Sequence, residues 1–535
     1  MTLVLGEVVL SCDIVSVAEI ELPTDLAGSH AMILELHKQF HELRGQYDDV
    51  KHQLDRMSRH MYGRRSEQLD ATQLQLAFAA LKEELVALGT PEKDLPAEPS
   101  ASDRPKRPGH GRRELPASWP RVRRVIEPAA DDLVCACCGR AKVRIGEDVS
   151  RKVDHVPESF TVIETVLPKY ACSKCKDGVT VALAPRGPID KGLATAGLLA
   201  HVVVSKYVDH APLSRQCDIF ARLGADFARQ TLCGWVEQVF ELLTAVDAFQ
   251  WRSILASHVL AADETPVKVL VPGRKDCARG YLWCYLGDRG EVAFDFSMGR
   301  HSETPTRALK EFHGGVLLCD AYAGYDEVER TTPELVRAGC MAHARRKVFE
   351  AKDLDPDRAL ILLALIRQLY DVESEVAAAE CVDAAARYRL ALQLRQEKSR
   401  VVMASIEEHV ERYRVDAVPK SPMGKALGYI HNQWRPLSRF LADGAIPIDN
   451  NSVERQIRPI AVGRGGWTFI GSEDAGPWAA RLYGLLGTCR IQGINPYEWL
   501  KDVLERVRDH PPDRTQELTP RGWKLARSTA LVGAT

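Results

Sequence analysis

A heptad-like repeat of hydrophobic residues is the first pattern along the chain. Apolar side chains recur at alternating spacings of three and four over about four heptads, the period of a coiled coil. They are Ile33, Leu36, Phe40, Leu43, Tyr47, Val50, Leu54, Met57 and Met61. Residues 70–73 resemble a capping box that opens a second amphipathic helix. The pattern predicts a helical, coiled-coil region over 28–90, and a helical hairpin packed on its own chain fits it equally well.

The periodicity changes several times after this region. Prolines recur through residues 91–120, which predicts an extended linker. The pattern is helical over 187–250, alternates in short β-like runs over 255–345 and is helical again over 345–440. The last hundred residues combine a polar loop with short strands and helices. Together these changes predict a multidomain α+β protein.

Composition and charge narrow the class of protein. Hydrophobic residues make up 45% of the chain, enough for a folded core, and 71 basic residues nearly balance 73 acidic ones. Nucleic-acid binding is therefore not indicated by net charge and must come from local clusters. No apolar run reaches the length of a membrane span, and the N-terminus lacks the basic start of a signal peptide. These features predict a cytoplasmic protein that does not contact the membrane.

The linker becomes basic toward its end. Arg112 and Arg113 belong to a group of arginines and lysines that extends to Arg124, with Glu114 as the acid among them. A solvated tether and a flexible arm that contacts DNA phosphates both fit this charge pattern.

Two C-x-x-C motifs predict a zinc module over residues 121–183. The chain has fourteen cysteines and no secretory signal, which favours reduced thiols and metal binding over a disulfide scaffold. Four thiolates from two such turns complete a tetrahedral Zn²⁺ site. The predicted ligands are Cys135, Cys138, Cys172 and Cys175. Residues 139–171 separate the motifs by more than the usual ribbon spacing, and buried free cysteines or a redox pair are the alternatives.

Residues 212–240 are a candidate helix–turn–helix. A helix beginning near Pro212 is followed by Gly224 at the turn and by a second amphipathic helix. Arg229 and Gln230 fall near the start of that second helix, where recognition helices contact bases. Paired helices around a glycine are common, so an ordinary helical hairpin is the alternative.

Three acids carry the strongest chemical signal. Asp263 lies in a hydrophobic strand, Asp320 ends another strand, and Glu454 lies near the start of a helix. Acids on neighbouring strands and a helix can converge on two Mg²⁺ ions, which prefer oxygen ligands and can stabilise both reacting oxygens of a phosphodiester. Each acid also has a structural alternative, as a turn residue, a helix cap or a capping-box glutamate respectively. The long segment between Asp320 and Glu454 predicts a helical insertion over about 345–440.

Cys340-Met341-Ala342-His343 forms a C-x-x-H motif after the expected strand at 335–340. Two ligands are too few for a separate metal site. Packing at the edge of a pocket is therefore expected, with an approach of His343 to phosphate as the alternative.

The sequence as a whole resembles a transposase of the insertion-sequence-66 family, the longer product called the transposase C protein. The resemblance covers roughly residues 30–505 and is carried by the two cysteine pairs and several short segments. These segments are 61–67, 168–171, 204–209, 263–266, 320–325, 339–346, 448–459 and 493–497. Gly465-Gly466-Trp467 departs from the family pattern, which usually has Lys-Asn before the aromatic residue, and Gly487 stands where relatives usually carry a glutamate.

The resemblance implies an RNase H-like catalytic domain over 255–480. The helical pattern before it predicts a helix–turn–helix-like DNA-binding domain over 187–250, and the end of the chain predicts a C-terminal helical element over 481–535. The resemblance assigns the DDE triad, which binds Mg²⁺ or Mn²⁺, to Asp263, Asp320 and Glu454. Arg455 and Arg458, beside the last acid, are further candidate DNA contacts.

The implied function is binding of the element's terminal inverted repeats, followed by metal-dependent cleavage and strand transfer into target DNA. A homo-oligomer in the synaptic complex, small companion proteins of the element and a location at the bacterial nucleoid are also implied. A nuclease without strand transfer and a catalytically impaired DNA-binding protein remain the alternatives.

Overall fold

The computed structural model describes residues 158–171, 179–332 and 334–532, together with a few short stretches and single positions before residue 154. Nearly all of the predicted coiled coil over 28–90, the linker at 91–120 and the four predicted zinc ligands lie outside the described residues. The chain divides into two compact units: residues 98–184 with 218–227, and the remainder.

A five-stranded mixed sheet organises the larger unit. The strands are β3 (Val259–Val269), β4 (Ala278–Gly287), β5 (Val292–Ser297), β6 (Val316–Cys319) and β7 (Val336–Gly339). Their order is β5-β4-β3-β6-β7, in which β3 pairs antiparallel with β4 and parallel with β6. The five strands confirm the short β-like runs expected over 255–345, and β3 lies at the centre of the sheet.

Alternation along the strands divides the sheet into two faces. One face packs in a core that includes Leu260, Ala262, Trp283 and Tyr285. Helix α6 (Thr244–Leu255) packs against β4 and β5, and α8 (Ala323–Thr331), which supplies Tyr325 to this core, packs against β7. Helices α15 (Asn451–Trp467) and α16 (Ala475–Ile491) pack against β3 and β5 respectively. The central strand is therefore covered by α15, a helix that lies almost two hundred residues later in the sequence.

The region before the sheet is helical, as its sequence pattern predicts. It contains α3 (Ala196–Tyr207), α4 (Leu213–Arg222) and α5 (Arg229–Leu242), followed by α6. Gly224 has a φ of 86°, a conformation that glycine adopts without steric cost, in the turn between α4 and α5. The two helices and the turn at residues 212–240 are confirmed as local structure.

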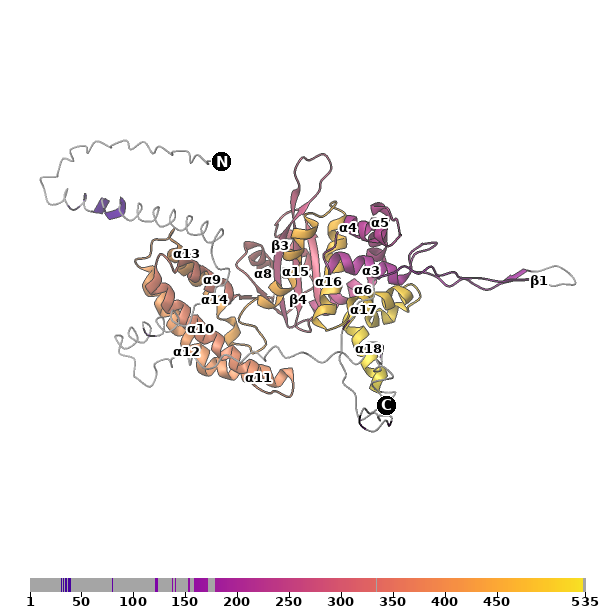
Figure 1. Cartoon of the computed structure of the whole chain (residues 1–535). Helices are drawn as coiled ribbons and strands as arrows, with labels where there is room; N and C mark the ends of the chain where they lie inside the picture. The colour runs from indigo at the N-terminus through magenta and orange to yellow at the C-terminus, as the bar shows by residue number, and fades with distance from the viewer. Residues whose placement is uncertain are drawn as a thin grey trace. The chain divides into compact units, whose positions relative to one another are not determined.

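Helices also fill the predicted insertion. They are α9 (Met341–Ala351), α10 (Pro356–Ala378), α11 (Ala384–Leu394), the π-helical turn η3 (Arg395–Ser399), α12 (Arg400–Arg414), α13 (Pro422–Asn432), α14 (Trp434–Leu437) and η4 (Arg439–Leu441). Helix α9 packs against α10 and α13, and α12 packs against the same two helices. Figure 1 shows these helices grouped together in orange. The insertion is therefore a packed helical unit that starts directly after β7.

The remaining elements complete the described chain. Helix α7 (Glu303–Ala308) follows β5, whereas α17 (Pro496–Arg506), η5 (Pro512–Leu518) and α18 (Pro520–Val532) follow α16. In the smaller unit, β1 (Lys169–Ala171) pairs antiparallel with β2 (Val179–Val181). Within the part of the chain that the structure describes, no helix is long and apolar enough to cross a bilayer.

Candidate active site

The first two acids lie on neighbouring parallel strands. Asp263 is in the middle of β3, and Asp320 directly follows the end of β6. The pairing of Val259, Leu260 and Ala261 with Val316, Leu317 and Leu318 sets the register between these strands. Because parallel strands run in the same direction, both acids lie beyond the paired segment toward the same edge of the sheet.

The surroundings of Asp263 are strongly acidic. Burial raises the pKa of its carboxyl group well above the usual value, and the charges of Glu264, Asp320 and Glu454 raise it further. The backbone N–H of Glu264 donates to one carboxylate oxygen at 2.9 Å, which offsets only part of this effect. The two aspartates and Glu454 are therefore close enough to interact electrostatically, as an acid cluster that favours a bound cation.

Glu264 is held differently, although it is the next residue. Its side chain is only 4% exposed, it forms an ion pair with Arg300, and the Tyr325 hydroxyl donates to it at 3.1 Å. Arg300 also lies 3.9 Å from Asp320 and stacks over the Tyr322 ring, 4.0 Å from its centroid. Burial, followed by the charge of Asp320, raises the pKa of the Glu264 carboxyl, while Arg300 lowers it.

Asn450 connects the helix that carries Glu454 to the strand that carries Asp263. Its side chain is fully buried, and its Nδ2 donates to the carbonyl of Ala262 at 2.8 Å. Asn450 is the N-cap residue of α15, so Glu454 lies in the first turn of that helix. One hydrogen bond thus links the start of α15 to the residue just before Asp263.

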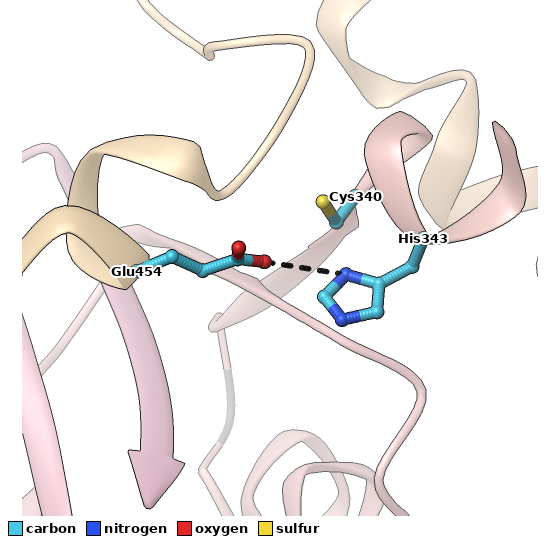
Figure 2. Close-up of side chains that lie close together, drawn as sticks. All are labelled: Cys340, His343 and Glu454. Carbon is cyan, nitrogen blue, oxygen red and sulfur yellow. Dashed lines mark ion pairs between the residues drawn. The ribbon is translucent and has the colours of Figure 1, made fainter. Parts of the chain in front are cut away.

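Cys340 and His343 approach Glu454 from the end of β7 and the start of α9. Figure 2 shows the imidazole facing the carboxylate, with 3.8 Å between His343 Nδ1 and Glu454 Oε1, which is too long for a hydrogen bond. The three possible ligand atoms lie within 4.8 Å of one another. However, the Cys340 sulfur already accepts hydrogen bonds from the backbone N–H groups of Asn450, at 3.2 Å, and His343.

Burial raises the pKa of the Cys340 thiol to about 12, so the sulfur stays protonated near neutral pH. The hydrogen bond from Asn450 thus joins the C-x-x-H motif at the start of α9 to the start of α15. The expected packing at a pocket edge and the approach of His343 to phosphate stay predictions.

The helical insertion also holds the segment that leads into α15. The buried guanidinium of Arg395 forms a two-pronged ion pair with Glu373 and donates to the carbonyls of Phe440, Asp443 and Ile446 at 2.9–3.1 Å. The Tyr370 hydroxyl donates to Asp449 at 2.9 Å. These contacts fix the chain immediately before Asn450 and Glu454.

Comparison with known proteins identifies the family. The model described as "Transposase IS66 family" matches residues 191–477, more than half of the chain, including the three acids. The chain belongs to the IS66 family of transposases. The "zinc-finger binding domain of transposase IS66" matches residues 132–176, which include all four predicted zinc ligands, and indicates a zinc-binding segment in this family member.

Two further family models match the ends of the IS66-family chain. "IS66 C-terminal element" matches residues 484–521, and "Transposase C of IS166 homeodomain" matches 49–124. With the larger matches, these confirm the family resemblance seen in the sequence and mark the chain as a DNA-binding protein of an insertion element.

Similar chains occur in Sinorhizobium fredii (strain NBRC 101917 / NGR234). Uncharacterized protein y4qI is 35% identical over 88% of this chain and 87% of its own length. Uncharacterized protein y4hP is 31% identical, with 90% and 89% covered. Among solved structures, the Mos1 transposase paired-end complex with left transposon end matches 48% of this chain and 81% of its own at 10% identity and a TM-score of 0.13. This structural match is too weak to bear on fold or function.

The other predicted contact residues of this IS66-family transposase have varied placements. Arg229 and Gln230 are exposed at the start of α5, and Arg455 and Arg458 are exposed on α15. A role of any of these in DNA binding stays a prediction. Arg112 and Arg113 lie outside the described residues, as do the four zinc ligands.

Several residues around the acid cluster were not singled out in the sequence. Arg300 lies in the loop after β5, and no motif marks it as a partner of Glu264. Asn450 belongs to the polar run before Glu454, but its role depends on a bond to a residue far away in sequence. Glu264 is adjacent to Asp263, and only this position in the sequence could have indicated that it lies near the acid cluster.

Proposed function

We propose that this transposase binds the terminal inverted repeats of its element and catalyses their cleavage and transfer into target DNA. The acid cluster is the observation that carries the proposal. Asp263, Asp320 and Glu454 come from three separate elements, and the charges of the other two raise the pKa of Asp263. Folding brings such groups together at a cost in repulsion, which divalent cations would relieve.

The three carboxylates would hold Mg²⁺ or Mn²⁺. Their oxygen atoms are the donors that these ions prefer, and partial exposure of Asp320 and Glu454, at 21% and 28% of their side chains, leaves room for water and substrate. When bound, the two ions would neutralise charge on the attacking and leaving oxygens. Asn450 and Cys340 would keep Glu454 beside Asp263, and Asp320 would face both the cluster and Arg300.

The sheet supports the proposal that the catalytic domain is RNase H-like. Three antiparallel strands, β5, β4 and β3, continue into the parallel strands β6 and β7. Asp263 is on the central strand, and Asp320 directly follows its parallel neighbour. Helix α15 packs on the central strand and supplies the third acid.

DNA binding would involve the amino-terminal modules. We expect Cys135, Cys138, Cys172 and Cys175 to hold one Zn²⁺, and Arg229 and Gln230 to contact bases. Arg112, Arg113, Arg455 and Arg458 would add sequence-independent contacts to phosphates. A homo-oligomer would join the two element ends, and the small companion proteins of the element would be further partners.

The test is a cleavage and strand-transfer assay with end-labelled element-end DNA. Glu454→Gln and Asp320→Asn should each lower Mg²⁺-dependent cleavage by at least about a thousandfold while DNA affinity changes little, because metal ligands and not basic contacts are lost. Glu473→Gln, at an exposed acid near the start of α16, is the matched control and should cleave normally.

The assay also separates the alternatives. Cleavage without joined products would identify a nuclease, and binding without cleavage by the unmodified protein in Mg²⁺ or Mn²⁺ would identify a DNA-binding regulator. Full activity of either acid variant would refute the triad.

A further inference from the structure

The hairpin formed by β3 and β4 extends well past the other strands. β3 pairs with β6 only at Val259–Ala261, and β4 pairs with β5 only from Tyr281 onward. Residues 267–280 therefore pair only with each other within the sheet, apart from one bridge between Val269 and Ile470. Figure 1 shows this hairpin and its loop projecting beyond the labelled end of β3. The projection begins only a few residues after Asp263.

One face of the hairpin carries an unfavourable pair of charges. Lys268 and Arg279 are directly opposite in the register, so their side chains point to the same face. Both are exposed, and neither forms an ion pair with any residue in the described part of the chain. Like charges in this position destabilise a hairpin. Arg274 and Lys275 add two exposed cations at the tip. A local arrangement that opposes stability indicates a functional role.

The same face, which is the face of Glu264 and not of Asp263, continues as aromatic residues toward Arg300 beside Asp320. Alternation places Glu264, Pro266 and Lys268 on this face, opposite Trp283, Tyr281 and Arg279 respectively. The rings of Tyr281, Trp283 and Tyr322 follow one another, with centroids 6.4 and 6.0 Å apart. Arg300 stacks on Tyr322 and is 39% exposed. Tyr281 and Tyr322 are each partly exposed and also pack against the core, and Trp283 between them is fully buried.

We infer that this face, the basic–aromatic strip of Lys268, Arg279, Tyr281, Arg300 and Tyr322, binds the DNA strand that enters the acid cluster. Cations that follow a backbone and aromatic rings that stack on bases are the two features of surfaces for single-stranded nucleic acid. The strip contains both cations and aromatic rings, arranged one after the other along this face. It ends at Arg300, 3.9 Å from Asp320. The inference rests on the proposed function and adds the path of the strand.

Because Lys268 and Arg279 repel each other, replacing both should weaken DNA binding without destabilising the fold, and this combination tests the inference. In Lys268→Gln/Arg279→Gln, the dependence of log affinity on log salt for element-end DNA should become shallower by about 1.4, or ~0.7 for each lost contact to a single strand. The thermal midpoint should stay equal or rise, because the repulsion is removed. Lys310→Gln/Lys501→Gln removes two exposed cations elsewhere and should leave the salt dependence unchanged.

An unchanged salt dependence, or an equal change in the control, overturns the inference. So does weaker binding accompanied by a lower thermal midpoint, since the cations would then stabilise the fold. Neither result touches the proposed function, which depends on loss of cleavage in Glu454→Gln.

The aromatic residues distinguish a single strand from a duplex. Tyr281→Leu should weaken binding of element-end DNA with unpaired flanking nucleotides by about tenfold, as expected for the loss of one stacked base. A blunt duplex of the same sequence should bind as before. Equal losses on the two substrates, or no loss on either, would show that no strand stacks on the strip.

Discussion

Asp263 and Glu264 are adjacent in β3, yet their carboxyl groups have different surroundings. Glu264 has a cation, Arg300, and a hydroxyl donor, Tyr325, supplied by the protein. Asp263 interacts with three other acids and with the backbone N–H of the next residue. Alternation along the strand sends the two side chains to opposite faces. One carboxylate is thus neutralised by the fold, whereas the acid cluster needs a charge from outside the chain.

The largest expected effect compares these two neighbours directly. Asp263→Asn should lower metal-dependent cleavage by about a thousandfold or more, as expected for loss of a metal ligand. Glu264→Gln should lower it by less than about tenfold, because its charge is already paired. Both variants remove one negative charge from adjacent positions, so cleavage rates at saturating Mg²⁺ are directly comparable. Equal losses would mean that Glu264 belongs to the acid cluster.

The second prediction removes the cation from the paired carboxylate. Arg300→Gln should lower the free energy of unfolding by about 2 kcal/mol, because Glu264 stays buried without its charge partner, and the partial exposure of Arg300 moderates the loss. Chemical denaturation would measure it. Glu264→Gln in the same chain should recover most of the loss. Failure of this rescue would show that Arg300 stabilises the fold through Tyr322 and not through the carboxylate.

The smallest expected effect concerns the link between α15 and β3. Asn450→Asp keeps the shape of the side chain but replaces the donor to the Ala262 carbonyl with an acceptor. We expect a loss of about 1–2 kcal/mol in stability and, at temperatures where the variant is folded, about tenfold slower cleavage with an unchanged DNA affinity.

Asn432→Asp makes the same substitution at an exposed position on α13 and should change neither quantity by much. Normal cleavage by Asn450→Asp would mean that Glu454 is placed by other contacts, such as those of Arg395 and Tyr370.

Much of the local structure around the sheet and the helical insertion was predictable from local pattern. Apolar alternation predicted the strands around Asp263 and Asp320, and the Ala- and Leu-rich composition predicted the helices between Asp320 and Glu454. Motif spacing and the family resemblance then predicted that the three acids act together as one site. These features depend on neighbouring residues or on motifs, which is why one sequence was enough to find them.

The sequence by itself determined which residue types were available: three acids in or beside two strands and a helix, four cysteines in two C-x-x-C motifs, and a helical insertion of sufficient length. Only the tertiary structure decided their partners. It paired Glu264 with Arg300 and linked Asn450 to Ala262. It also placed Arg395 where its hydrogen bonds hold the chain before Glu454. On the projecting hairpin, it placed Lys268 directly opposite Arg279. Hydrogen bonds and charge pairs act over a few ångströms in space, and contacts between segments distant along the chain leave no periodic signal in sequence.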